Sequence, residues 1–358
     1  MTPRFASRVL ATLALATAAA FAWRALNLPL PWVLGPLLAT AVASIMGAPT
    51  QSWTPLQNTG QWVIGTALGL YFSPEVSALV LRSWWAVSLA VVWALAVGWI
   101  FGLWLYWHAG SRLPGGEQGR RATSYFAGAI GGASEMTLLA ERNDGRTDLV
   151  AAAHSLRLVI VTVGIPFVFS FAGLHGADVA PPVLRTVAWG PLAVLGAATL
   201  AGALALSRVG WANPWFIGAL AVSMTLTMSG VQLSALPAWL ANAAQLVIGV
   251  SLGVRFRAEF IHTAPRWLAV VALGTVLMIV GCAAFAAALA WVTGLHPATL
   301  VLGTAPGGIA EMAITAKVLQ LGVPVVTAFQ VCRLATVLLL VAPLYRLLYG
   351  RRGGLEGK

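Results

Sequence analysis

Long apolar stretches recur from one end of this chain to the other, and they restrict what it can fold into. Eight of them are long enough to cross a bilayer as helices: residues 8–23, 28–47, 83–107, 147–172, 183–207, 212–231, 266–292 and 323–345. Each helical residue adds about 1.5 Å towards a hydrocarbon thickness of about 30 Å. Hydrophobic residues make up 59% of the chain and charged residues only 9%, so it lacks the polar surface of a soluble globule. The sequence therefore predicts an all-α integral membrane protein, surrounded by the lipid bilayer.

The first apolar segment has a second interpretation. It follows Arg4 and Arg8 and in this respect resembles a cleavable signal peptide. We favour a retained first helix, because the membrane body behind it needs one. The two cysteines, Cys282 and Cys332, lie inside apolar segments and form no CxxC pair. They indicate neither a disulfide nor a zinc site, and we expect no metal and no cofactor.

The net charge of +11 does not require a nucleic-acid partner. Basic residues of a membrane protein with many crossings collect in its cytoplasmic loops. The longest polar connection, near residues 109–122, is too short to form a DNA-binding domain. We therefore expect no direct binding of nucleic acid.

The second half of the chain repeats the first in the same order. The matching blocks are PWVLGPL at 31–37 with PWFIGAL at 214–220, VIGTALGLYFSPE at 63–75 with VIGVSLGVRFRAE at 247–259, and GGASEM at 131–136 with GGIAEM at 307–312. In the longest block, seven of thirteen positions are identical. This pattern predicts two homologous membrane repeats, residues 1–176 and 177–358, with six helical elements in each.

Charge placement predicts how the two repeats are oriented. If all twelve helical elements crossed the membrane, the 21 Lys and Arg residues would divide almost evenly between its faces. If each GGxxEM element enters and leaves by one face, fifteen lie inside, four lie outside, and Arg157 and Arg333 lie in the membrane. The positive-inside rule favours the second arrangement. We therefore predict inverted repeats with about ten crossings, two broken or re-entrant GGxxEM elements, and both termini in the cytoplasm.

The paired glycines mark a candidate site. Gly131 and Gly132, like Gly307 and Gly308, weaken the helix that contains them, and Pro306 strengthens the second interruption. Within a membrane, irregular backbone is tolerated only where protein or a water-filled cavity surrounds it. Two explanations stay open. The glycines could allow close packing, or the interrupted elements could hold a substrate or an ion with their free amide and carbonyl groups.

Two acids and two arginines favour the second explanation. Glu135 and Glu311 belong to the repeated motif, and Arg157 and Arg333 each follow 22 residues later. An ionised side chain near the bilayer centre costs on the order of 2.5–3.5 kcal/mol, so such groups face the interior and pair. The four residues could form two structural Glu–Arg pairs. Alternatively, the glutamates could bind a proton or cation while the arginines recognise an anionic substrate.

Further polar side chains recur on helix faces. The repeated pairs are Asn58 with Gln61 and Asn242 with Gln245. Either pair could join helices or line a cavity, because residues three apart share a helix face. His154 and Gln330 each stand about one turn before the arginine of their half, so they present hydrogen-bonding groups on the same face as that arginine.

These motifs resemble those of the AbrB-duplication membrane proteins. The duplicated GGxxEM, each followed by an arginine-bearing helix, extends over essentially the whole chain. In that family a proline usually precedes the glycines, so Pro306 conforms whereas Ile130 departs, and the second half carries the resemblance more fully. Members of the family are called AbrB family transcriptional regulators, regulators of gene expression, or ammonia monooxygenases.

The residues favour transport over the activities in these names. A copper monooxygenase needs clustered ligands, whereas the five histidines are scattered over different segments, so we expect no enzyme. No DNA-binding motif accompanies the regulator name, and no Walker A motif indicates transport driven by ATP. We therefore expect a carrier of the secondary-transporter type, which moves a small solute, with a coupling ion, through a site at the two GGxxEM elements.

The alternative is a membrane-bound regulator of gene expression that acts indirectly, through a partner protein. In either case we expect the inner membrane of a bacterium as the location. A homodimer is compatible with the sequence, although no helix face defines one.

Overall fold

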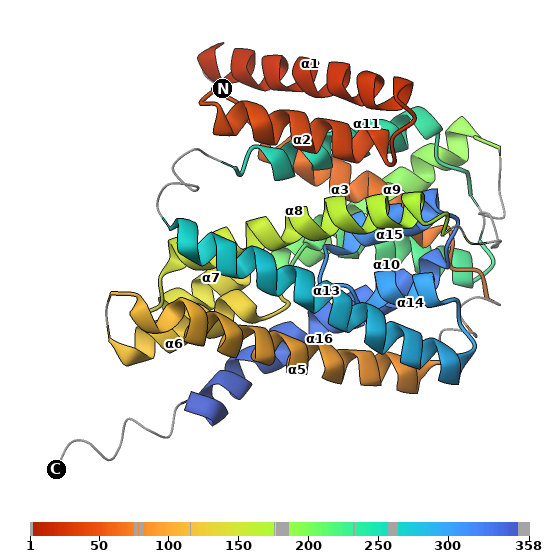
Figure 1. Ribbon diagram of the computed structural model, residues 1–358. Coiled ribbons are helices and arrows are strands. Elements are labelled where there is room, and N and C mark those ends of the chain that lie inside the picture. Colours follow the sequence, from red (N-terminus) through yellow and green to blue (C-terminus); the bar gives the residue numbers. More distant parts are fainter. Residues whose placement is uncertain are drawn as a thin grey trace.

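The structure is a computed structural model, and it describes residues 3–74, 78, 82–114, 116–174, 176, 186–231, 233–256 and 264–349. Within these ranges the regular structure is helical (Figure 1). The first half contains α1 (Pro3–Ala25), α2 (Pro31–Ile45), α3 (Thr54–Gly69), α5 (Trp84–His108), the 3-10 turn η1 (Gly110–Arg112), α6 (Glu117–Gly128), α7 (Ala133–Glu141) and α8 (Thr147–Phe171). The second half contains α9 (Trp189–Arg208), α10 (Pro214–Met228), α11 (Ala238–Gly253), α13 (Pro265–Thr293), α14 (Pro297–Thr304), α15 (Ile309–Val318) and α16 (Val323–Tyr349).

The longest helices suit a bilayer. Within the described ranges, six helices are long and apolar enough to cross it: α1, α5, α8, α9, α13 and α16. Large apolar side chains lie on the outside of the molecule, among them Trp291 and Phe171, which are 90% and 81% exposed. The predicted all-α membrane fold is confirmed. The predicted number of ten crossings stays a prediction. It would need α2, α3, α10 and α11 to cross the membrane, and these helices have only 15 or 16 residues.

The repeated Pro-Trp pairs begin helices in the same way. Leu30 and Asn213, the residues before the two prolines, both adopt the left-handed conformation, with φ of 46° and 50°. Each proline then takes the first helical position, where its missing N–H costs nothing. The repeated sequence therefore produces the same sharp turn into α2 and into α10.

Glycines at matching positions make matching helix contacts. Gly65 of α3 packs against the backbone of Phe216 in α10, and Gly249 of α11 packs against the backbone of Val33 in α2. Gly65 matches Gly249 in the repeated blocks, and Val33 matches Phe216. A Cβ at either glycine would collide with a carbonyl oxygen, so only glycine permits this close approach.

Helices α5 and α13 occupy matching places in the two halves and run in opposite directions. Trp93 stacks on Phe285 with 4.7 Å between ring centroids. Further along α5, Trp104 Nε1 donates a hydrogen bond of 3.3 Å to the carbonyl of Val270. Residue numbers therefore rise along α5 as they fall along α13, and the two helices are antiparallel.

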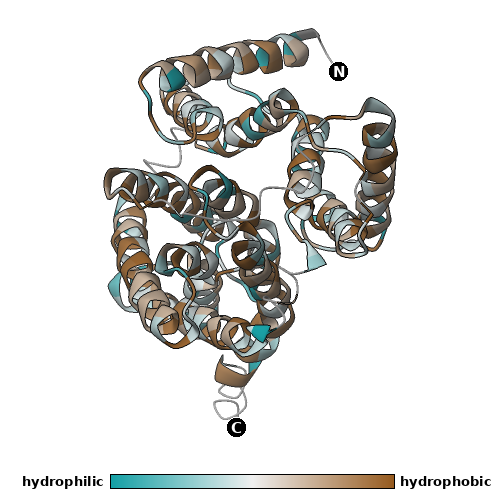
Figure 2. Ribbon diagram, turned by 90° about the vertical axis from the view of Figure 1, so that its right-hand side faces the viewer, coloured by the Kyte–Doolittle hydropathy of each residue, from teal (hydrophilic) through white to brown (hydrophobic). Residues whose placement is uncertain are grey.

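The helices pack as two bundles (Figure 2). The first bundle contains α1, α2, α3, α9, α10 and α11, and the second contains α5, α6, α7, α8, α13, α14, α15 and α16. Each bundle combines helices from both halves of the chain. The predicted repeats, residues 1–176 and 177–358, are therefore not the same units as the two bundles.

Candidate functional site

Both GGxxEM motifs interrupt a helix. In the first half α6 ends at Gly128 and α7 begins at Ala133, and in the second α14 ends at Thr304 and α15 begins at Ile309. Four residues separate the helices in each case, and they include the paired glycines. The predicted interruptions are confirmed.

The first glycine of each pair packs against the methionine of the motif. A Cβ on Gly131 would lie 2.7 Å from Cε of Met136, and a Cβ on Gly307 would lie 2.9 Å from Cε of Met312. Both methionines are fully buried. Five residues apart in sequence, glycine and methionine form one packing unit that holds the broken segment against the helix after it.

The second glycine of each pair makes room for the glutamate. A Cβ on Gly132 would collide with Oε2 of Glu135, and a Cβ on Gly308 would collide with Oε2 of Glu311. Each glutamate lies in the first turn of its helix, at α7 and α15, and its carboxylate folds back over the glycine that begins the helix. The positive end of the helix dipole stabilises a carboxylate in this position.

The arginines do not pair with these glutamates. Arg157 donates hydrogen bonds to the carbonyls of Ala127, Gly128 and Ala129 at 3.2, 3.3 and 3.1 Å. These carbonyls lie at the end of α6, where the interruption removes their helical partners. With five donors, a guanidinium can satisfy several of them at once.

The second half uses the same arrangement. Arg333 donates to the carbonyl of Ala305, and at 2.8 Å to that of Gly307, beyond the end of α14. Both arginines are almost fully buried, Arg157 being 3% and Arg333 5% exposed. Among the described residues no Glu–Arg ion pair forms here, so of the two alternatives that the sequence left open, structural Glu–Arg pairs are wrong. Unsatisfied carbonyls in a dry environment attract a buried guanidinium, while the glutamates are held by helix N-termini instead.

A second polar side chain supports each arginine. His154 Nε2 donates to the carbonyl of Phe126 at 2.9 Å, and its Nδ1 accepts from Arg157 at 2.8 Å. In the other half, Gln330 Nε2 donates to the carbonyls of Leu302 and Ala305 at 2.6 and 3.1 Å. The helix faces predicted from the sequence are therefore used to cap the broken helices.

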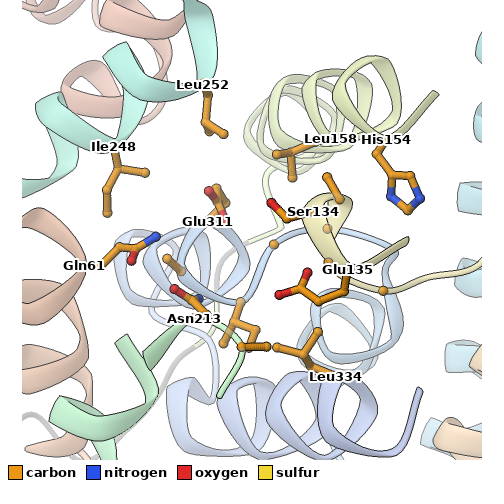
Figure 3. Close-up of a pocket in the computed structure, with 18 of the residues that line it drawn as sticks. Gln61, Ser134, Glu135, His154, Leu158, Asn213, Ile248, Leu252, Glu311 and Leu334 are labelled. Atoms are coloured by element: carbon orange, nitrogen blue, oxygen red, sulfur yellow. The ribbon is translucent and has the colours of Figure 1, made fainter. Parts of the chain in front are cut away.

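The two interruptions face one cavity of about 330 Å³ between the bundles. The sequence-predicted residues that line it are Asn58, Gln61, Gly131, Gly132, Glu135, Arg157, Gly307, Gly308, Glu311 and Arg333. Figure 3 shows Glu135 with Ser134 from α7, Glu311 from α15 and Gln61 from α3 around this space, and His154 also belongs to its lining. Glu311 is 7% exposed, whereas Glu135 is half-buried.

The remaining predicted pair lies elsewhere. Asn242 and Gln245, on the first half of α11, do not belong to the cavity lining. The later part of α11 lines it instead, with Ser251 and, just beyond the helix end, Arg255. The cavity therefore meets α3 and α11 at different heights, although the sequences of these helices match.

Five polar residues of the lining were not predicted from the sequence: Gln57, Ser134, Asn213, Ser251 and Arg255. One signal was available for Arg255. In the longest repeated block it replaces Tyr71, so it introduces a charge at a position where the two halves differ.

Tyr71, the residue of the first half that matches Arg255, makes a contact between the bundles. Lys317 Nζ of α15 lies over the ring of Tyr71, which follows α3, at 5.9 Å from the ring centroid. Glu141 matches Lys317 in the repeated sequence. Glu141 and Arg255 are both exposed, and they form no ion pair with each other or with another residue in the part of the chain that the structure describes.

Comparison with known proteins points to one family. The family model described as Transition state regulatory protein AbrB matches residues 32–349. A Bacillus subtilis (strain 168) protein named "Uncharacterized protein YhjN" is 24% identical over 377 residues, which cover 97% of this chain and 94% of that protein. An Escherichia coli (strain K12) protein named "Putative regulator AbrB" is 25% identical over 324 residues, which cover 88% of this chain and 89% of that protein. Since the family model matches well over half of the chain, this protein belongs to the AbrB family.

Proposed function

We propose that this protein is a secondary-transporter-like carrier that moves a small solute through the cavity between its two bundles. The observation that carries the proposal is the meeting of two broken helices, with buried charges at their ends, at one cavity of about 330 Å³. Burying an ionised group in a membrane protein costs free energy. Packing alone does not require such groups, so their presence favours a functional role. Discontinuous helices beside a central cavity are a recurring way in which transporters form their sites.

The two ends of the interface between the bundles support alternating access. At one end Lys317 meets Tyr71 across the interface, while at the other end Arg255 lines the cavity and is exposed. In the carrier that we propose, movement of the bundles brings Arg255 to Glu141 and separates Lys317 from Tyr71. The predicted inverted repeats supply the reason, because each state uses the matching pair of positions from opposite halves.

This exchange predicts two crosslinks. In a background with Cys282→Ala and Cys332→Ala, a Tyr71→Cys/Lys317→Cys protein should be joined rapidly by a bifunctional thiol reagent. A Glu141→Cys/Arg255→Cys protein should also be joined, more slowly, as the molecule samples its other state. Gel mobility after cleavage of the intervening chain measures both. A second pair that never links, under conditions in which the first links fully, would contradict the exchange.

Protons are the coupling ions that suit this site. The carbonyls at the ends of α6 and α14 accept hydrogen bonds from arginines, so a metal cation would have to displace a guanidinium to reach them. Glu135 and Glu311 lack a bonded cation in the described residues and lie in the cavity lining. We therefore assign the binding and release of protons to these two carboxylates.

The orientation in the membrane follows from charge. The start of α1, the end of α16 and the link from α5 to α6 lie at one end of the molecule, the left in Figure 1. Arginines accumulate in these segments, which favours the cytoplasm for this end. The relatives named above come from bacteria, and we propose the bacterial inner membrane as the location.

A ligand screen on the purified protein tests the function. Amino acids, organic acids, ammonium and sodium would be added across a range of pH while thermal unfolding is followed. A bound solute at 100 times its Kd should add about 2.7 kcal/mol of stability. Glu311→Gln should abolish this effect, whereas Glu117→Gln, which changes an exposed carboxylate at the start of α6, should keep it. Equal stabilisation of both variants would show that Glu311 takes no part in binding, which would contradict the proposed site.

A membrane-bound regulator that acts through a partner protein is the second candidate. The description of the family model and the name of the Escherichia coli relative favour it. Such a regulator would not need to bind a solute when purified alone. Absence of stabilisation by every solute, together with a Glu311→Gln protein less stable than the wild type, would favour this candidate over the carrier.

A further inference from the structure

The five charged side chains that line the cavity differ in what they contact. Glu135 and Glu311 lie at the N-terminal ends of α7 and α15, while Arg157 and Arg333 bind the carbonyls at the ends of α6 and α14. Each of these four charges therefore faces a helix end of opposite partial charge. Arg255 also lines the cavity, and its charge is attracted by that of Glu311, but it makes no hydrogen bond or ion pair with any residue that the structure describes.

The cavity consequently has an excess of positive charge. When all of its acids and arginines are ionised, the guanidiniums of Arg157, Arg255 and Arg333 outnumber the carboxylates of Glu135 and Glu311 by one. One buried hydrogen-bond donor in the lining also has no acceptor among the described residues. Nε of Arg333, a side chain that is only 5% exposed, has no hydrogen-bond acceptor within the described ranges.

Neutral polar groups surround this excess charge. Ser251 lies in the last turn of α11, close before Arg255 in the sequence, and amides from α3 and from the start of α10 complete the lining. These lining amides are Gln57, Asn58, Gln61 and Asn213. They can both donate and accept hydrogen bonds, which suits a solute with hydroxyl or carbonyl groups beside its charge.

We propose that the solute is a small organic anion with one carboxylate, which Arg255 binds. The inference rests on the proposed carrier function and names its substrate class. A guanidinium offers two parallel N–H donors that match the two oxygens of a carboxylate. When the bundles move and Arg255 pairs with Glu141, the anion loses its partner and is free to leave on the opposite side.

Matched probes test the charge of the solute. Two sets share a carbon skeleton and differ in charge: lactate, lactamide and 1-amino-2-propanol, and benzoate, benzamide and benzylamine. Thermal unfolding of the purified protein would be measured with each. We expect at least one carboxylate to raise the Tm, and its amide and amine to leave the Tm unchanged.

Substitutions of Arg255 test whether this residue binds the carboxylate. Arg255→Gln should weaken binding of that carboxylate by at least about tenfold, because a charge-assisted bidentate contact is lost. Arg255→Lys should restore part of it, and Arg346→Gln, at an exposed arginine of α16, should bind like the wild type. Since Arg255 is exposed, the folded state of its variants is expected to persist, and their unliganded Tm checks this.

The outcomes separate the two proposals. If an amine or amide binds instead and Glu311→Gln removes that binding, the carrier proposal stands and the anion assignment fails. If a carboxylate binds equally well to Arg255→Gln, or if no carboxylate binds at all, the anion assignment also fails. The carrier proposal is then decided by solute release from vesicles, which needs no assumption about charge.

Discussion

Replacing Arg333 with leucine should lower the free energy of unfolding by roughly 3 kcal/mol. The leucine keeps much of the volume but donates no hydrogen bond, so the carbonyls of Ala305 and Gly307 lose the donors that Arg333 provides. Both acceptors belong to buried residues at a helix interruption, where an unpaired carbonyl costs stability. Unfolding of the purified protein in mixed micelles, followed by circular dichroism, measures the change.

A second arginine on the same helix provides the control. Arg346 lies near the end of α16 and is exposed, so Arg346→Leu should change stability by less than about 0.5 kcal/mol. Similar losses in the two variants would mean that Arg333 acts through general charge rather than through the carbonyls of the interruption.

Replacing Gly308 with alanine should remove ligand-induced stabilisation while leaving most of the fold intact. The added methyl group would collide with the Glu311 carboxylate, which must then turn away from the start of α15. Because the obstructing atoms are the end of a flexible side chain, we expect the cost in stability to stay below about 1.5 kcal/mol. Binding of any solute that depends on Glu311 should fall by at least about tenfold, as a 1.4 kcal/mol loss of interaction would produce.

Gly164 is the matched control for this substitution. It lies in the interior of α8, and a Cβ there would meet nothing within 4 Å. Gly164→Ala should bind solute normally and be as stable as the wild type or slightly more stable, because alanine favours helix. Normal solute binding by Gly308→Ala would show that the position of the Glu311 carboxylate does not matter.

The sequence was informative where local backbone chemistry decides the structure. Paired glycines within apolar stretches predicted the interruptions, which the structure places at residues 129–132 and 305–308, and the repeated Pro-Trp pairs prove to begin α2 and α10. These features depend on a few neighbouring residues, so a motif is enough to recognise them.

The hydrogen-bond partners of the two arginines could not be predicted from a local motif. A spacing of 22 residues places Arg157 and Glu135 on successive helices, but it does not say which polar group is closest. The acceptors are backbone carbonyls that lack helical partners at the interruption. Every residue has a carbonyl, so residue types do not reveal which ones are unpaired. Counting charged side chains alone therefore gave the wrong pair.

The duplication also concealed an asymmetry. Because Asn58 and Gln61 recur as Asn242 and Gln245, the sequence predicted equal roles for both pairs. The cavity reaches only the first pair, because it meets α3 near its start and α11 near its end, where Ser251 and then Arg255 line it. Which of two matching residues faces a cavity depends on how the bundles pack, which the repeats alone do not determine.

Release of solute from vesicles tests the central claim most directly. Purified protein would be reconstituted into liposomes loaded with a small-molecule extract of bacterial cytoplasm, and the solutes that escape would be identified by mass spectrometry. If the cavity carries a solute, at least one small molecule should leave faster than from protein-free liposomes, and Glu311→Gln should return its rate to the protein-free value. Identical release of every solute from wild-type, Glu311→Gln and protein-free liposomes would contradict transport through this cavity.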